Sequence, residues 1–161
     1  MKNQIFISVV LSVFLFTFVF AQDKIEKENV EAVATHFLNS AANQLSIPSD
    51  LIATESLDKT KELELKMALD YDSTGTSNSM MSLPANKIKS MTSAEVWDHR
   101  NNIAQSMEKS DLNIEWNIVK TEIKNDEAFV TYDVKGREQK VMQLKNENGK
   151  WKVVLSFGSI F

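Results

Sequence analysis

Cysteine is absent from the 161 residues of this chain. Its absence excludes disulfides, thiolate nucleophiles and every metal site that uses a cysteine ligand. It also excludes the lipid attachment that a bacterial lipoprotein carries next to its cleavage site. A domain without disulfides must be held together by its hydrophobic core, and a chain of this length is large enough to form one.

Glycine and histidine are scarce. The four glycines stand apart, so the chain has neither a phosphate-cradling loop nor a Gly-x-Ser-x-Gly elbow. The two histidines, His36 and His99, are too few for a His-rich zinc site within one chain. Residues 70–73 (Asp-Tyr-Asp-Ser) lack the ligand series of a calcium loop. We therefore expect no metal site and no cofactor.

Basic residues are fewer than acidic ones. The chain has 18 Lys and Arg against 22 Asp and Glu, a net charge of −4, and no basic block. A mildly acidic chain of this kind is a poor candidate for binding nucleic acid or an anionic membrane. We expect no nucleic-acid partner.

A long apolar run stands near the N-terminus, from Ile5 to Phe20, after the charged Lys2. It ends in Val19-Phe20-Ala21, with small residues at the −3 and −1 positions that signal peptidase reads. The pattern predicts a signal peptide over residues 1–21, cleaved after Ala21, and a secreted or periplasmic protein without a stable membrane anchor. An uncleaved anchor is less favoured, because a membrane-spanning helix needs about 20 apolar residues.

Residues 22–161 have the commonest size of a single domain, and we expect one domain there. Over residues 24–45, apolar residues recur at steps of three and four, which predicts an amphipathic helix. Pro48 prevents it from continuing far. Residues 49–57 are predicted to form a second, short helix with Ser49 as its N-cap.

The clearest helix start in the chain is a capping box formed by Thr92 and Glu95. Met91 and Val96 have the spacing of a hydrophobic staple around it. These residues predict a helix over residues 93–107.

The segment between these helices is ambiguous. Residues 61–72 are good helix formers, but their apolar residues alternate with charged ones, which favours a strand with one exposed face. We interpret the segment as a strand, with a helix as the open alternative. A polar loop is predicted over residues 73–79, and an irregular strand broken near Pro84 over residues 80–89.

From Leu112 onward the apolar residues alternate with a period of two. The parity changes near Ile118-Val119, as a β-bulge would cause. Turn residues at Asn125-Asp126, at Gly136 and over residues 146–149 (Asn-Glu-Asn-Gly) separate the following strands. The pattern predicts an antiparallel meander of four strands, covered on one face by the helices at 24–45 and 93–107.

The order of these elements resembles the nuclear transport factor 2-like superfamily, a cone-shaped α+β (cystatin-like) fold. The closing stretch, residues 144–154 (Leu-Lys-Asn-Glu-Asn-Gly-Lys-Trp-Lys-Val-Val), is similar to the last hairpin of secreted bacterial members, including lumazine-binding-like domains. The resemblance implies N-terminal helices packed on a curved antiparallel sheet of four to six strands, a pocket at the wide end, and a route to a homodimer through the open sheet face. It implies no single function, since the fold hosts enzymes, carriers and interaction modules.

One chemical candidate is Asp98-His99-Arg100 in the predicted helix 93–107. His99, tuned by a carboxylate, would suit a general base. Adjacent helical residues point about 100° apart, which favours three separately solvated side chains instead. Ketosteroid isomerase-type members of the superfamily use a Tyr on the first helix, and residues 24–45 contain none, so no catalytic residue carries over.

Large side chains supply the other candidates for a ligand pocket. Trp116, Tyr132 and Trp151 fall on the inward parity of their predicted strands, and Trp97 lies on the helix of residues 93–107. We expect an exported, non-catalytic accessory or binding domain for a small apolar ligand or a protein partner. The alternative is a cofactor-free isomerase or hydratase with His99 as its base. The candidate pocket residues are Trp97, His99, Arg100, Trp116, Tyr132 and Trp151.

Overall fold

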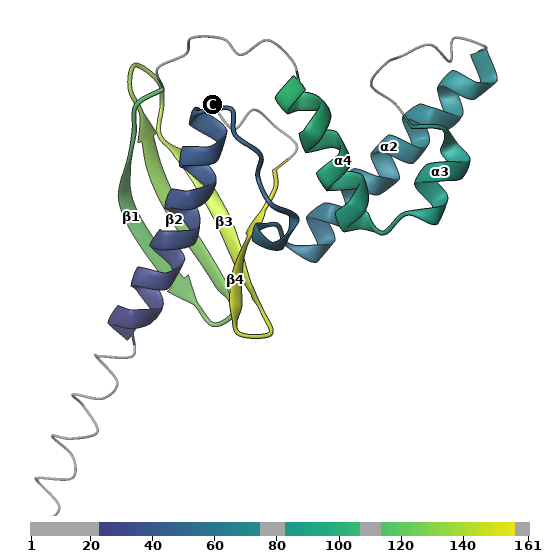
Figure 1. The fold of residues 1–161 in the computed structure, drawn as a ribbon. Coiled ribbons are helices and arrows are strands. Elements are labelled where there is room, and N and C mark those ends of the chain that lie inside the picture. Colours follow the sequence, from purple (N-terminus) through teal and green to yellow (C-terminus); the bar gives the residue numbers. More distant parts are fainter. Residues whose placement is uncertain (1–22, 75–82, 107–113, 157–161) are drawn as a thin grey trace, which may run out of the picture.

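The computed structural model describes residues 23–74, 83–106 and 114–156. These residues form helices followed by a four-stranded antiparallel sheet, which confirms the predicted α+β class (Figure 1). The predicted signal peptide, most of the polar loop at 73–79, and Leu112 lie outside the described residues. Within the described residues, no helix is both long enough and apolar enough to cross a membrane.

The sheet is the predicted meander. Its strands β1 (Trp116–Lys124), β2 (Glu127–Val134), β3 (Lys140–Glu147) and β4 (Lys150–Val154) are neighbours in chain order. The register of β1 against β2 shifts between Ile118 and Lys120, which confirms the bulge. The β3–β4 turn is formed by Asn148 and Gly149, both with positive φ, as a tight two-residue hairpin requires.

The N-terminal helix, residues 23–42, lies across one face of this sheet (Figure 1). It ends three residues earlier than predicted, because Gln44 adopts a left-handed conformation with φ 51°. The N–H of Leu45 then donates to the carbonyl of Ser40 at 2.7 Å, which closes the helix end. The main core forms between the helix and the sheet and includes Val30, Ala34, Phe37, Leu38, Val130, Tyr132, Leu144, Trp151 and Val153.

The strand predicted over residues 61–72 is wrong. After a 3-10 turn, η1 (Ser49–Leu51), these residues belong to one long helix, α2 (Thr54–Thr74), so the predicted short helix at 49–57 is wrong as well. Leu63 and Met67 are 38% and 43% exposed, whereas Ala68, which the strand pattern placed on the polar face, is buried. The residues of this segment are strong helix formers, and as a helix they pack Leu65 and Ala68 against Ile88 and Val96.

The predicted strand near Pro84 is also wrong. Residues Ala85–Ser90 form the short helix α3, and Pro84 is its N-cap. The next helix, α4 (Ser93–Ser106), confirms the capping box. Glu95 accepts a hydrogen bond from the N–H of Thr92 at 2.6 Å, and the N–H of Glu95 donates to the Thr92 hydroxyl at 3.2 Å.

Helix α4 does not cover the sheet as predicted. Together with α2 and α3 it forms a group beside β4, away from the helix of residues 23–42 (Figure 1). This group has a second core that includes Ala68, Ala85, Ile88 and Val96, with Leu65, Leu83 and Met91 packed against it. The N-terminal helix occupies the face of the sheet that carries the buried side chains.

Several hydrogen bonds attach the helical group to the rest of the domain. The N–H of Ala53 donates to the carbonyl of Val153 at 2.9 Å, next to a parallel bridge between Ile52 and Val153. At the other end, the Trp97 indole N–H donates to the carbonyl of Ile47 at 2.7 Å. Because residues 52–53 line the outer edge of β4, the last strand of the meander is partly covered.

Candidate functional site: a groove at the end of strand β4

Strand β4 is shorter than its neighbour β3, and this difference opens the candidate site. The last paired residues are Gln143 and Val154, so residues 140–142 of β3 run on without a partner from β4. The N–H of Leu155 donates at 2.9 Å to the hydroxyl of Ser56, a buried residue on α2. This bond attaches Leu155, the first residue after β4, to α2.

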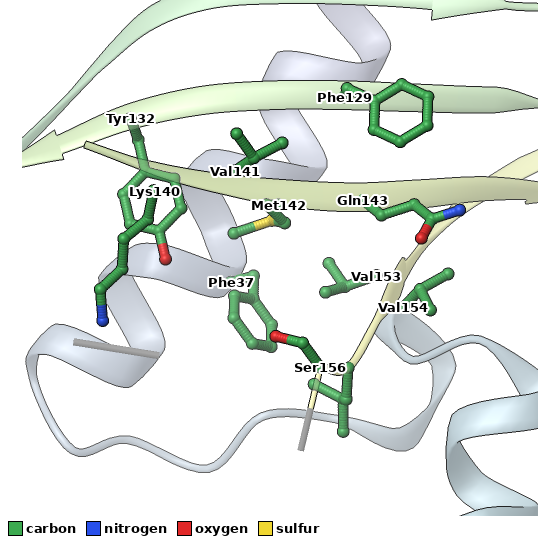
Figure 2. A pocket seen from close by; sticks show the side chains of 11 residues that line it. Phe37, Phe129, Tyr132, Lys140, Val141, Met142, Gln143, Val153, Val154 and Ser156 are labelled. Atoms are coloured by element: carbon green, nitrogen blue, oxygen red, sulfur yellow. The ribbon is translucent and has the colours of Figure 1, made fainter. Parts of the chain in front are cut away.

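A groove of about 580 Å³ lies at this point (Figure 2). Figure 2 shows Phe37, from the helix of residues 23–42, with Met142 of β3 and Val153 of β4 near it. The strands β2 and β3 supply the remaining wall. Its lining is mainly apolar and consists of Phe37, Phe129, Tyr132, Lys140, Val141, Met142, Gln143, Val153, Val154, Leu155 and Ser156.

The groove wraps around the sheet edge. Successive side chains of a strand point to opposite faces. Tyr132, Met142 and Val153 come from the helix-covered face and are buried, whereas Val141 comes from the other face and is 61% exposed. A ligand in the groove would therefore contact the edge of the main core and remain accessible from solvent.

One end of the groove is polar. Tyr132 and Lys140 are direct partners in the register of β2 and β3, and both line the groove. Figure 2 shows the phenol and the lysine chain side by side. Burial raises the pKa of the Tyr132 hydroxyl above its ordinary value of 10.0, so this group is protonated at neutral pH.

Among the six predicted pocket residues, the structure brings only Tyr132 to this groove. Trp151 lines a separate cavity of about 660 Å³, with the N-terminal helix and η1 around it. It is far from Trp116, because β4 and β1 are opposite edges of the sheet. Trp116 packs at the edge of the main core. Trp97 of α4 donates a hydrogen bond to the carbonyl of Ile47.

The triplet on α4 does not converge on one point. Asp98 accepts a hydrogen bond from the Ser49 hydroxyl at 3.2 Å, and Arg100 pairs with Glu64 of α2 at 2.9 Å. Neither His99 nor Arg100 lines the groove. Within the part of the chain that the structure describes, no hydrogen bond or ion pair joins His99 to a carboxylate, so the isomerase or hydratase alternative gains no catalytic pair.

Sequence reasoning assigned several lining residues to the core or did not single them out. Phe37 belongs to the apolar stripe of the first helix and Val153 to the apolar alternation of the last strand, and both are part of the main core. The sequence pattern does not predict Phe129 or Lys140 as pocket residues, because Phe129 has the outward parity of β2 and Lys140 begins a strand. Only the unequal lengths of β3 and β4 could have indicated a gap beside residues 140–142.

No group of three or more His, Asp or Glu side chains in the described residues could hold a metal ion. No family model matches the chain, and neither a curated protein nor a solved structure matches it. The membership of the nuclear transport factor 2-like superfamily therefore stays a prediction, as does the homodimer that it implies.

Proposed function

We propose that this protein is a non-catalytic binding domain that takes a small apolar ligand in the groove at the end of β4. The observation that carries the proposal is the apolar wall that Phe37, Met142 and Val153 of the main core form beside Val141, which is exposed at the sheet edge. The volume of the groove, about 580 Å³, lies within the usual range for small-molecule sites.

The proposal is tested with a neutral fluorescent probe, N-phenyl-1-naphthylamine, titrated into the protein. Saturable enhancement is expected for the wild type. Val141→Asp places a charge on an exposed lining residue and should weaken binding at least about fivefold, since burying an unpaired carboxylate beside the probe is unfavourable. Val119→Asp is the matched control, because Val119 is 48% exposed on β1 and does not line the groove. No saturable binding, or equal losses in both variants, would contradict the proposal.

A protein partner is the second candidate, and one observation favours it. The edge of β3 at residues 140–142 is not paired with β4, and an extended peptide can add a strand to such an edge. A peptide bound there would protect backbone amides around residues 140–142 from hydrogen exchange, whereas a small ligand would protect the region weakly. Hydrogen exchange is measured on the protein alone and with the host extract fraction that co-purifies with it. Strong protection around residues 140–142 indicates a bound peptide, and weak protection indicates a small ligand.

The proposed place of action is outside the cytoplasm. It follows from the apolar run of Ile5 to Phe20 and the small residues before Gln22. Protein recovered from the host envelope or medium should have the intact mass of a chain that begins at Gln22. A mass that includes Met1 would contradict export by cleavage.

A further inference from the structure

The second cavity, of about 660 Å³, lies between the N-terminal helix, η1 and the β3–β4 hairpin. None of its described lining residues also lines the groove at the end of β4. The helix contributes residues between positions 25 and 33, which extend over roughly 12 Å at about 1.5 Å per residue. The buried ring of Trp151 and the partly buried Val33 and Leu51 supply apolar surface. The cavity therefore has one long helical wall and an apolar patch.

Polar side chains from all three elements also line this cavity. They carry charges of both signs and two neutral amides, and they are Glu26, Asn29, Asp50, Asn146 and Lys150. None of these side chains makes a hydrogen bond or an ion pair within the part of the chain that the structure describes. Carboxylates only accept hydrogen bonds, an ammonium only donates them, and an amide does both. The cavity therefore offers donors and acceptors that water satisfies in the absence of a ligand.

This mixture of groups disfavours several classes of ligand. An anion would face the carboxylates of Glu26 and Asp50, and a multiply charged cation would face the ammonium of Lys150. A purely apolar ligand would remove water from the polar side chains without replacing its hydrogen bonds. A hydroxyl group both donates and accepts, so it can pair with a carboxylate, an ammonium or an amide. Several hydroxyl groups on an otherwise apolar C–H surface would suit both parts of the lining.

We infer that this cavity binds an uncharged saccharide, a short oligosaccharide that lies along the N-terminal helix. Asn29 of the helix and Asn146 of the hairpin bind sugar hydroxyls from two sides, and the C–H surface of the sugar covers the apolar patch at Trp151. The site is separate from the groove of the proposed function, and neither depends on the other.

Calorimetric titration with cellotriose, an uncharged trisaccharide, tests the inference, and trigalacturonate is the anionic probe of similar size. Cellotriose should bind saturably, and trigalacturonate at least about tenfold more weakly, because like charges brought together at a binding site are unfavourable. Asn29→Ala should weaken the binding of cellotriose about fivefold, through the loss of its hydrogen bonds to the sugar. In NMR spectra, cellotriose should shift the amide signals of residues 25–33 and 146–151 most.

Glu28→Ala is the matched control, because Glu28 is the exposed neighbour of Asn29 on the same helix and does not line the cavity. It should leave the affinity for cellotriose unchanged, and circular dichroism checks that both variants are folded. No saturable binding of cellotriose, equal affinity for the two probes, equal effects of the two variants, or shifts centred on residues 140–143 would each overturn the inference. The titration of the groove with N-phenyl-1-naphthylamine decides the proposed function separately.

Discussion

The carboxylate of Glu147, at the end of β3, caps helix α2 through Thr54. One carboxylate oxygen accepts a hydrogen bond from the backbone N–H of Thr54 at 2.9 Å, and the other accepts one from its hydroxyl at 2.7 Å. Lys152 of β4 pairs with the same carboxylate at 3.2 Å. This contact joins the helical group to the β3–β4 hairpin, and a negative charge at a helix N-terminus is stabilising.

The stability of the domain should depend on the ionisation of Glu147. Burial alone would raise its pKa, but the bonds from Thr54 and Lys152 outweigh burial and hold the pKa below the ordinary value of 4.5. A carboxyl group with a lowered pKa in the folded state stabilises fully above its unfolded pKa. That contribution is lost as the pH falls below about 4.5 and through the lowered pKa.

Glu147→Gln should therefore lower the free energy of unfolding at pH 7 and flatten its decline between about pH 5 and pH 3. Urea unfolding monitored by circular dichroism across this range measures both effects. Glu138→Gln is the control, because Glu138 is exposed between β2 and β3. A pH dependence of Glu147→Gln that matches the wild type would show that the cap contributes nothing.

Trp151 should be a major contributor to stability, because its ring is buried against the N-terminal helix and η1. Trp151→Ala is expected to cost about 3–5 kcal/mol, which is a large share of the roughly 5–15 kcal/mol typical of a domain. Lys150→Ala, on an exposed neighbour, should stay within about 0.5 kcal/mol. Sequence parity suggests Lys152 as the neutral control, but its pairing with Glu147 makes it unsuitable. Equal urea midpoints for the two variants would contradict the burial of Trp151.

Leu65 and Leu63 distinguish the helix from the alternating strand. A strand would place both on the same face, but in α2 Leu65 packs on the second core while Leu63 is exposed. Leu65→Ala should cost about 2–3 kcal/mol, and Leu63→Ala less than about 0.5 kcal/mol, since Ala is also an excellent helix former. Thermal or urea unfolding of the two variants measures the difference. Similar losses in both would support the strand.

Gly149 should be needed for its backbone conformation. Its φ is 79°, and a Cβ at this position would meet nothing within 4 Å, so a substitution is strained by the backbone and not by crowding. Gly149→Ala is expected to cost about 1 kcal/mol. Gly149→Asn should cost less, because Asn tolerates left-handed conformations. Equal costs in urea unfolding would point to a cause other than φ.

The sequence by itself determined the sheet and one helix start. Alternation with a period of two, the change of parity at Ile118-Val119, and the turn residues before Lys150 are local signals, and each of them predicted its structure correctly. The capping box of Thr92 and Glu95 is equally local, because its partners are three residues apart. These elements follow from backbone preferences that need no distant partner.

Only the tertiary structure decided the fate of residues 61–72 and the existence of the groove. In residues 61–72 the apolar alternation favours a strand and the residue propensities favour a helix. The helix is the form that packs on Val96 and Ile88. The groove exists because Ser56 takes the N–H of Leu155, a partner 99 residues away, and leaves residues 140–142 of β3 without a neighbour from β4. A gap of this kind depends on where two strands stop pairing, and the pairing is set by long-range contacts that no local pattern records.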